Sequence, residues 1–181
     1  FVINQREYAV PLVIEESSVV AAASNAAKFW SERGGFHARV ISRIKEGSVY
    51  FLFKGNFQVL ENNKQALLGE IKSGCKDITR RMDERGGGIL DLAFEDLSNE
   101  EPDSYKLTLY FDTCDSMGAN FINSVLESSS KILERWIYSP EISESATTYY
   151  ETIMCILSNY TPRCVAEAWV TCPISALGKI N

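Results

Sequence analysis

The feature that most constrains the fold is a change of hydrophobic period within residues 105–136. In the stretch YKLTLYFDTC apolar and polar residues alternate, which is typical of a strand with one buried face. After residues 115–120, Asp-Ser-Met-Gly-Ala-Asn, apolar residues recur every three or four positions, as in a helix with one face toward a core. The sequence therefore predicts a strand, a turn and a helix that begins near Gly118.

The start of this predicted helix is a candidate anion site. The first backbone N–H groups of a helix have no partner within it and carry partial positive charge, so a phosphate can bind against them. Gly118 would let a ligand approach without meeting a Cβ, and Asp115 could bind a ribose hydroxyl. Spacing alone favours a simpler interpretation without a ligand, in which Asp115 is the N-cap of the helix and Gly118 is a turn glycine.

Composition bounds the class of protein. The 181 residues are 45% hydrophobic, enough for one domain, or one domain and part of another. The chain has neither a run of eighteen apolar residues nor a signal-peptide layout, so we expect neither a membrane span nor secretion. Because it begins with Phe1, we expect a fragment of a longer protein.

Charge and cysteine usage exclude further classes. The net charge of −6 argues against a nucleic-acid surface, which is normally basic. Five cysteines without a Cys-x-x-Cys pair, and a single histidine, supply few ligands for a metal site. We therefore expect no metal, and reduced thiols in a cytoplasmic protein.

The remaining pattern predicts an α+β fold, an antiparallel sheet with helices on one face. We expect Ser17 or Ser18 to cap an Ala-rich helix that stops at Gly34-Gly35. Gly47 is expected to be the turn of a hairpin, and Gly86-Gly87-Gly88 a second hairpin turn. The other expected elements are strands over residues 8–14, 37–44, 49–53, 89–97 and 147–157, and a helix over residues 58–72.

Four motifs resemble the 3-hydroxy-3-methylglutaryl-coenzyme A reductases. Residues 115–120 resemble that family's dinucleotide-binding signature Asp-Ala-Met-Gly-Ala/Met-Asn. Residues 11–24 resemble Pro-Met/Leu-Val-x-Glu-Glu-Pro-Ser-x-Val-Ala-Ala-Ala-Ser of the bacterial, class II form, although Ser17 stands where proline is common. Residues 73–78 resemble Gly-Gly-Cys/Leu-Arg/Lys-Asp-Ile, and residues 156–159 resemble Ile-Leu-Ser-Asn.

The resemblance implies a domain organisation and an activity. Residues 36–157 would form a small, ferredoxin-like dinucleotide-binding domain, and residues 1–35 and 158–181 would belong to a larger substrate and dimerisation domain. The implied reaction interconverts 3-hydroxy-3-methylglutaryl-CoA and mevalonate plus CoA by two hydride transfers from NADPH or NADH. The implied partners are these small molecules and further copies of the parent chain, a homodimer or higher assembly.

The resemblance also assigns roles to residues. Glu16 corresponds to the family's catalytic glutamate, whereas without the resemblance Glu15 and Glu16 are simply acids beside a helix start. An ungapped alignment from Gly74-Cys75 places Gln65 where some members carry an aspartate that repels the 2′-phosphate of NADP, so both cofactors stay open. The expected substrate contacts are Ser18 and Asn159, and the expected cofactor contacts are Gln65, Asp115, Met117, Gly118 and Asn120.

The family's catalytic lysine, aspartate and histidine have no counterpart in this sequence and are expected beyond Asn181. We therefore expect a fragment that binds nucleotide without turning over substrate alone. The alternative is a non-catalytic ferredoxin-like binding or oligomerisation module, in which residues 115–120 form only a helix start.

Overall fold

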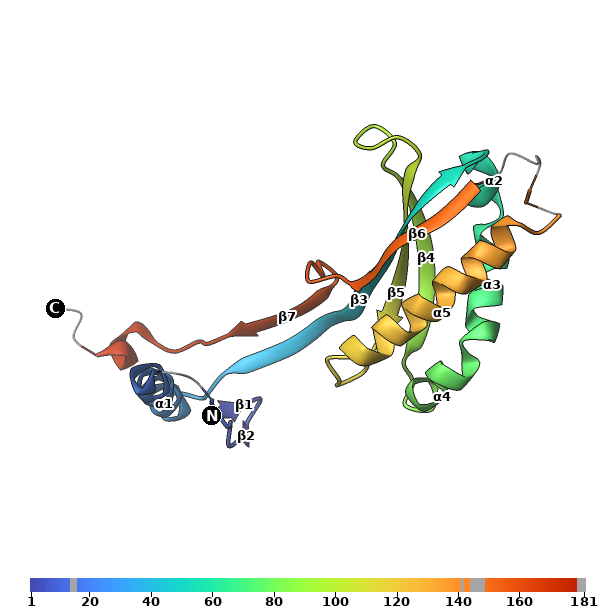
Figure 1. Cartoon of the computed structure of the whole chain (residues 1–181). Helices are drawn as coiled ribbons and strands as arrows, with labels where there is room; N and C mark the ends of the chain where they lie inside the picture. The colour runs from blue at the N-terminus through green and yellow to red at the C-terminus, as the bar shows by residue number, and fades with distance from the viewer. Residues whose placement is uncertain (14–15, 141, 144–148, 179–181) are drawn as a thin grey trace. The chain divides into compact units, whose positions relative to one another are not determined.

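The computed structural model describes residues 1–13, 16–140, 142–143 and 149–178. The chain forms two compact units (Figure 1). The first consists of Phe1–Ser42 with Val165–Asn181, and the second is Arg43–Cys164. The functional domain boundaries expected from the sequence, at residues 35/36 and 157/158, stay a prediction.

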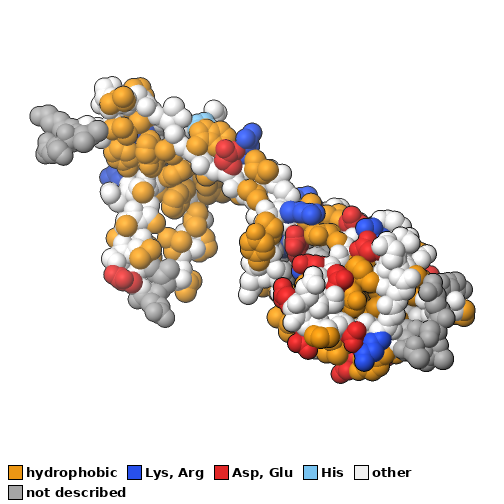
Figure 2. All heavy atoms as spheres, turned by 90° about the horizontal axis from the view of Figure 1, so that it is seen from above, with side chains coloured by type: hydrophobic (Ala, Val, Ile, Leu, Met, Phe, Trp, Pro, Cys, Tyr) orange, Lys and Arg blue, Asp and Glu red, His pale blue; other side chains and the backbone are white. Residues whose placement is uncertain are grey.

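The first unit contains short elements. They are β1 (Val2–Ile3), β2 (Arg6–Glu7), α1 (Ser17–Ser31), most of β7 (Cys164–Trp169) and the 3-10 helix η1 (Ile174–Leu177). The strand predicted over residues 8–14 is wrong for its described part, because residues 9–13 have no backbone hydrogen-bond partner among the described residues; Ile14 lies outside them. Figure 2 shows apolar side chains gathered over the surface of this unit. Its exposed apolar residues include Val13, Val40 and Ile174.

Helix α1 departs from its predicted ends. Its N-cap is Glu16 rather than Ser17 or Ser18, and no side chain caps it. It ends at Ser31, before Gly34-Gly35, which have φ angles of 99° and 78°. A Cβ on Gly35 would lie 2.7 Å from the carbonyl oxygen of Val2. This pair of glycines therefore lets the chain turn back against β1.

The second unit is an α+β sandwich of two layers. Its antiparallel strands lie in the order β4 (Gly88–Asp96), β5 (Ser104–Asp112), β3 (His37–Lys54) and β6 (Tyr149–Leu157). Helices α3 (Lys64–Gly74) and α5 (Ala119–Ile137) lie along one face of this sheet (Figure 1). This β-α-β-β-α-β arrangement confirms the predicted ferredoxin-like fold.

Strand β3 is continuous where a hairpin was predicted. Gly47 does not form a turn; it pairs with Leu109 on one side and Leu157 on the other. A Cβ at Gly47 would lie 2.7 Å from Ile122 and 2.8 Å from Leu126, both on α5. The glycine is therefore required by the close approach of the helix, not by chain reversal.

The predicted helix over residues 58–72 is two helices, α2 (Phe57–Asn62) and α3, separated at Asn63, whose φ and ψ are −106° and 9°. A further helix, α4 (Lys76–Asp83), was not predicted. Residues 86–88 connect α4 to β4 and are not a hairpin turn. A Cβ on Gly87 would lie 2.4 Å from the carbonyl oxygen of Asp112, so this connection crosses close to the end of β5.

The core lies between the sheet and the helices. The three alternating residues of the central strand, Leu107, Leu109 and Phe111, are fully buried, as predicted from their period. Helix α5 begins at Ala119 and contributes the apolar face expected from the sequence. Its buried apolar residues are Ile122, Val125, Leu126, Ile132, Leu133 and Ile137.

Candidate functional site

The candidate site is built on the loop that joins β5 to α5. Gly118 is the N-cap of α5, with a φ of 80°. A Cβ at this position would lie 2.5 Å from Cγ2 of Thr113, which is fully buried. The space that a Cβ would need is therefore taken by Thr113 rather than left open for a ligand, which corrects one expected role of this glycine. The left-handed turn itself requires glycine.

Reciprocal hydrogen bonds fix the loop internally. Thr113 Oγ1 donates to the carbonyl oxygen of Ser116 at 2.8 Å, and Ser116 Oγ donates to the carbonyl oxygen of Thr113 at 2.7 Å. Asp112 Oδ1 accepts a hydrogen bond of 2.7 Å from the backbone N–H of Cys114, whose φ is 52°. The loop is therefore cross-linked by its own side chains.

Two cations from β3 hold the same loop from outside. Arg43 Nη2 lies 2.9 Å from Asp112 Oδ2. Lys45 Nζ donates to the carbonyl oxygens of Ser116 and Met117, at 2.7 Å and 2.8 Å. The carbonyl groups just before α5 are thus engaged by the protein.

The N–H groups at the start of α5 are free. The backbone N–H groups of residues 117–121 have no hydrogen-bond partner in the part of the chain that the structure describes, and the first bond of the helix is that of the Ile122 N–H to the carbonyl oxygen of Gly118. Consecutive unpaired N–H groups at a helix N-terminus form a positive, donor-rich surface that suits an anion with several oxygens.

Three predicted cofactor residues lie at this surface. Asp115, Met117 and Asn120 are exposed, and Met117 is exposed by 74% of its surface. Among the described residues the Asp115 carboxylate has neither a hydrogen bond nor an ion pair, and no side chain caps α5. The alternative that Asp115 is merely the N-cap is therefore not what the structure shows, and its carboxylate is available to a ligand.

A pocket of about 290 Å³ adjoins the first turns of α5. Arg81 and Arg85 reach it from α4 and from the turn that follows. Arg85 Nε donates to the carbonyl oxygen of Arg81 at 3.1 Å, whereas the Arg81 guanidinium has no partner among the described residues. The residues that line the pocket are Ile78, Arg81, Met82, Arg85, Asn120, Phe121 and Ser124.

Sequence reasoning missed these arginines. A helical period over residues 76–85 would have placed Arg81 and Arg85 on one face, four residues apart, but nothing in the sequence showed that this face lies beside the start of α5. Lys45 was missed for the same reason, since it is 71 residues from Ser116 in sequence.

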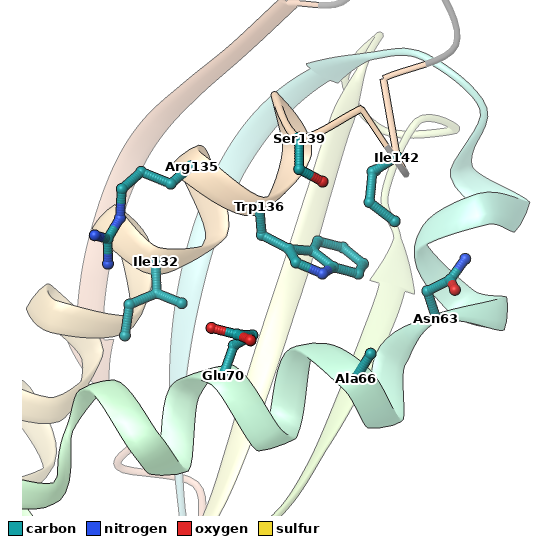
Figure 3. Close-up of a pocket in the computed structure, with 8 residues that line it drawn as sticks. All are labelled: Asn63, Ala66, Glu70, Ile132, Arg135, Trp136, Ser139 and Ile142. Carbon is teal, nitrogen blue, oxygen red and sulfur yellow. The ribbon is translucent and has the colours of Figure 1, made fainter.

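Gln65 does not lie at this site. It is exposed near the N-terminus of α3, where Asn63, Ala66 and Glu70 face the C-terminal half of α5 across a pocket of about 570 Å³ (Figure 3). The other side of that pocket is formed by Ile132, Arg135, Trp136, Ser139 and Ile142. Because a helix rises 1.5 Å per residue, the two ends of α5 are about 27 Å apart. The structure therefore does not bring Gln65 together with residues 115–120.

The expected catalytic and substrate residues lie elsewhere. Glu16 is exposed and accepts a hydrogen bond from Ser18 Oγ, and both belong to the first compact unit. Asn159 is exposed between β6 and β7. The approach of Glu16 to the nucleotide site, and the roles of Ser18 and Asn159, stay predictions. Glu15 lies outside the described residues.

Neither a membrane span nor a metal cluster is found in the described part of the chain. Within these ranges no helix is long and apolar enough to span a membrane. The same residues contain no group of three or more His, Cys, Asp or Glu side chains placed to hold a metal ion.

Comparison with known proteins gives one family. The model of the family described as hydroxymethylglutaryl-coenzyme A reductase matches residues 1–180. The 3-hydroxy-3-methylglutaryl-coenzyme A reductase of Archaeoglobus fulgidus is 32% identical over 149 residues, which cover 75% of this chain and 31% of that protein. The probable 3-hydroxy-3-methylglutaryl-coenzyme A reductase of Borreliella burgdorferi is 33% identical over 134 residues, which cover 69% of this chain and 28% of that protein. The chain thus spans less than a third of the length of these relatives.

Solved structures agree with this result. A class II 3-hydroxy-3-methylglutaryl-CoA reductase from Streptococcus pneumoniae, bound to NADPH in open conformations, matches 92% of this chain with a TM-score of 0.71 and 34% identity. The match covers 42% of that chain. A second structure of the reductase from this organism matches the same share with a TM-score of 0.70, and 37% of its chain is covered.

Proposed function

Since this chain belongs to the hydroxymethylglutaryl-coenzyme A reductase family, we propose that it is the cofactor-binding portion of an oxidoreductase of that family. Its Arg43–Cys164 unit binds a nicotinamide dinucleotide, and the pyrophosphate lies against the N–H groups of residues 117–121. The observation that carries this proposal is that these donors are unpaired directly beside the Asp-Ser-Met-Gly-Ala-Asn motif.

The surroundings of the loop suit the rest of the nucleotide. The exposed Asp115 carboxylate is free to accept hydrogen bonds from ribose hydroxyls. Arg81 and Arg85 place two guanidinium groups at the pocket beside Asn120 and Ser124, where they can bind a phosphate with paired N–H donors. We therefore propose NADPH as the preferred cofactor, with these arginines, and not Gln65, as the residues that meet its 2′-phosphate.

The parent enzyme interconverts 3-hydroxy-3-methylglutaryl-CoA and mevalonate plus CoA. NADPH held at residues 117–121 would supply one hydride for each of two reductions. The thioester would take up a hydride and a proton and release CoA as the thiol, and the aldehyde would take up a second hydride and a second proton to give the alcohol. Glu16 exchanges a proton with the reacting oxygen, and Ser18 and Asn159 contact the substrate. The sequence offers no counterpart for the family's catalytic lysine, aspartate or histidine, so the 181-residue chain binds cofactor without turnover. We propose that the parent acts as a homo-oligomer.

Titration of the 181-residue chain with NADPH and with NADH, followed by nucleotide fluorescence, tests this proposal. Saturable binding with a lower Kd for NADPH is expected. The absence of a saturable signal with either nucleotide would favour the alternative, a non-catalytic ferredoxin-like module.

Replacement of one arginine tests the cofactor preference. Arg81→Gln should weaken NADPH binding roughly tenfold, because a charge-assisted contact to phosphate is lost, and should leave the Kd for NADH nearly unchanged. Arg80→Gln is the matched control, since Arg80 is the exposed neighbour on α4 and does not line the pocket. Equal losses for both nucleotides in Arg81→Gln would contradict the assignment of this residue to the 2′-phosphate.

A further inference from the structure

Lys45 is a charged side chain on the face of β3 that the helices cover. Its strand partner is Phe111, which is fully buried and packs edge-to-face against Phe121 of α5. From this position the ammonium group reaches the loop before α5 and donates to two consecutive carbonyl oxygens, of Ser116 and Met117. A lysine held between sheet and helix by two backbone acceptors has a fixed position.

The geometry of the peptide group links these contacts to the anion site. In a trans peptide the C=O and the following N–H point in opposite directions, and no described peptide bond is cis. Since the carbonyl groups of Ser116 and Met117 point toward Lys45, the N–H groups of Met117 and Gly118 point away from it. These are the first two of the unpaired donors of residues 117–121.

The positive charge of Lys45 also strengthens the N–H groups of Met117 and Gly118 as hydrogen-bond donors. A hydrogen bond from an ammonium group to a carbonyl oxygen polarises the peptide and makes its N–H a better donor. The carbonyl oxygen of Ser116 also accepts from Thr113 Oγ1, so both of its lone pairs are used, one by the loop and one by β3. Lys45 would therefore act on a ligand indirectly, through the peptide groups that it contacts.

We propose that Lys45 is a positioning residue for the pyrophosphate of the dinucleotide. It holds and polarises the peptide groups that follow Ser116 and Met117, so that their N–H groups face the ligand. This inference rests on the proposed function, because it concerns the same nucleotide site.

The test compares variants of the 181-residue chain by NADPH titration. Lys45→Met, which keeps the aliphatic stem and removes the donor, should raise the Kd for NADPH roughly tenfold. Lys45→Arg, which keeps charge and donors, should restore most of the affinity. Lys106→Met is the matched control, since Lys106 lies on β5 of the same sheet, is partly buried and pairs with Glu95, away from the loop. The Kd of Lys106→Met for NADPH should match that of the unaltered chain.

A second probe separates positioning from a general loss of structure. Adenosine 2′-phosphate lacks the pyrophosphate, so its Kd, measured by competition with NADPH, should be unchanged in Lys45→Met. If that variant lacks the far-UV circular dichroism spectrum of the unaltered chain, Lys45→Gln replaces it in both titrations.

The outcomes are distinct. If the unaltered chain does not bind NADPH, the proposed function is wrong. If the unaltered chain binds and Lys45→Met binds equally well, the function stands and the inference about Lys45 is overturned. If adenosine 2′-phosphate and NADPH weaken by the same factor, Lys45 only stabilises the fold, and the inference is again overturned.

Discussion

At the scale of single residues, Gly118 shows how one position can meet two constraints. Its φ of 80° is unfavourable for residues with a Cβ, and Thr113 occupies the volume that a Cβ would need. The buried Thr113 in turn hydrogen-bonds Ser116 and so closes the loop. A substitution at Gly118 should therefore disturb both the turn and the proposed anion site.

Gly118→Ala should lower the free energy of unfolding by about 1–3 kcal/mol, from backbone strain and displacement of Thr113. Urea unfolding followed by circular dichroism measures this change. Gly69→Ala is the control, because Gly69 lies within α3 and a Cβ added there would meet no neighbouring atom within 4 Å. That substitution should raise stability by about 0.5–1 kcal/mol. Equal stability of Gly118→Ala and the unaltered chain would contradict the packing described for the loop.

The sequence identified the residues of the motif at 115–120, but not the residues from other elements that lie beside it. Asp115, Met117, Gly118 and Asn120 lie within six consecutive residues, so a local pattern was enough to place them at a helix start, as the structure shows. Lys45 reaches the loop through the sheet register, and Arg81 reaches the pocket at the first turns of α5 through helix packing. A single sequence does not encode either placement locally. The site roles of all these residues stay predictions until ligand binding is measured.

At the scale of elements, the contact between β3 and α5 is set by a glycine. Gly47 lies in a strand that pairs on both sides, and its missing side chain gives room to Ile122 and Leu126. The sheet and the helix can then approach closely enough for Lys45, two residues earlier, to reach the loop before α5.

Gly47→Ala should lower the free energy of unfolding by about 1–3 kcal/mol, because a methyl group forces fully buried side chains of α5 to move. Urea unfolding again provides the measurement, with the same Gly69→Ala control. An increase in stability, as expected for a glycine that merely weakens a strand, would contradict the close packing of α5 on β3.

The errors of element prediction have physical causes. A glycine between two apolar runs predicts a hairpin, yet inside a sheet it also marks a close approach of another element, and only the tertiary contacts decide between them. The α4 helix was missed because it is short and mostly polar: its eight residues, KDITRRMD, include few apolar ones, and only Thr79 and Met82 are buried. Long and strongly periodic elements, α5 and β5, were predicted correctly.

At the scale of the whole molecule, the buried apolar residues are unevenly distributed. Among the described residues, Ala27 is the one buried apolar residue of the first unit, and all the others lie in Arg43–Cys164. Because local stability follows the density of buried contacts, the two units should open with different free energies.

Hydrogen exchange followed by mass spectrometry measures this difference in the 181-residue chain. Backbone amides of α5 and of residues 48–53 should exchange more slowly than those of α1 and β7 by several orders of magnitude, because the latter lack a buried apolar face. Equal protection of α1 and α5 would show that the first unit has a core that the structure does not contain.

The proposed function depends above all on where the pyrophosphate of NADPH binds, at the unpaired N–H groups that open α5. Amide ¹H–¹⁵N chemical shifts of the 181-residue chain, recorded during an NADPH titration, report on this position residue by residue. Binding there should give saturable shifts of the amides of residues 117–121, larger than those of residues beside Trp136 at the far end of α5. Saturable binding that leaves residues 117–121 unshifted, with changes confined to the pocket between α3 and the end of α5, would contradict it.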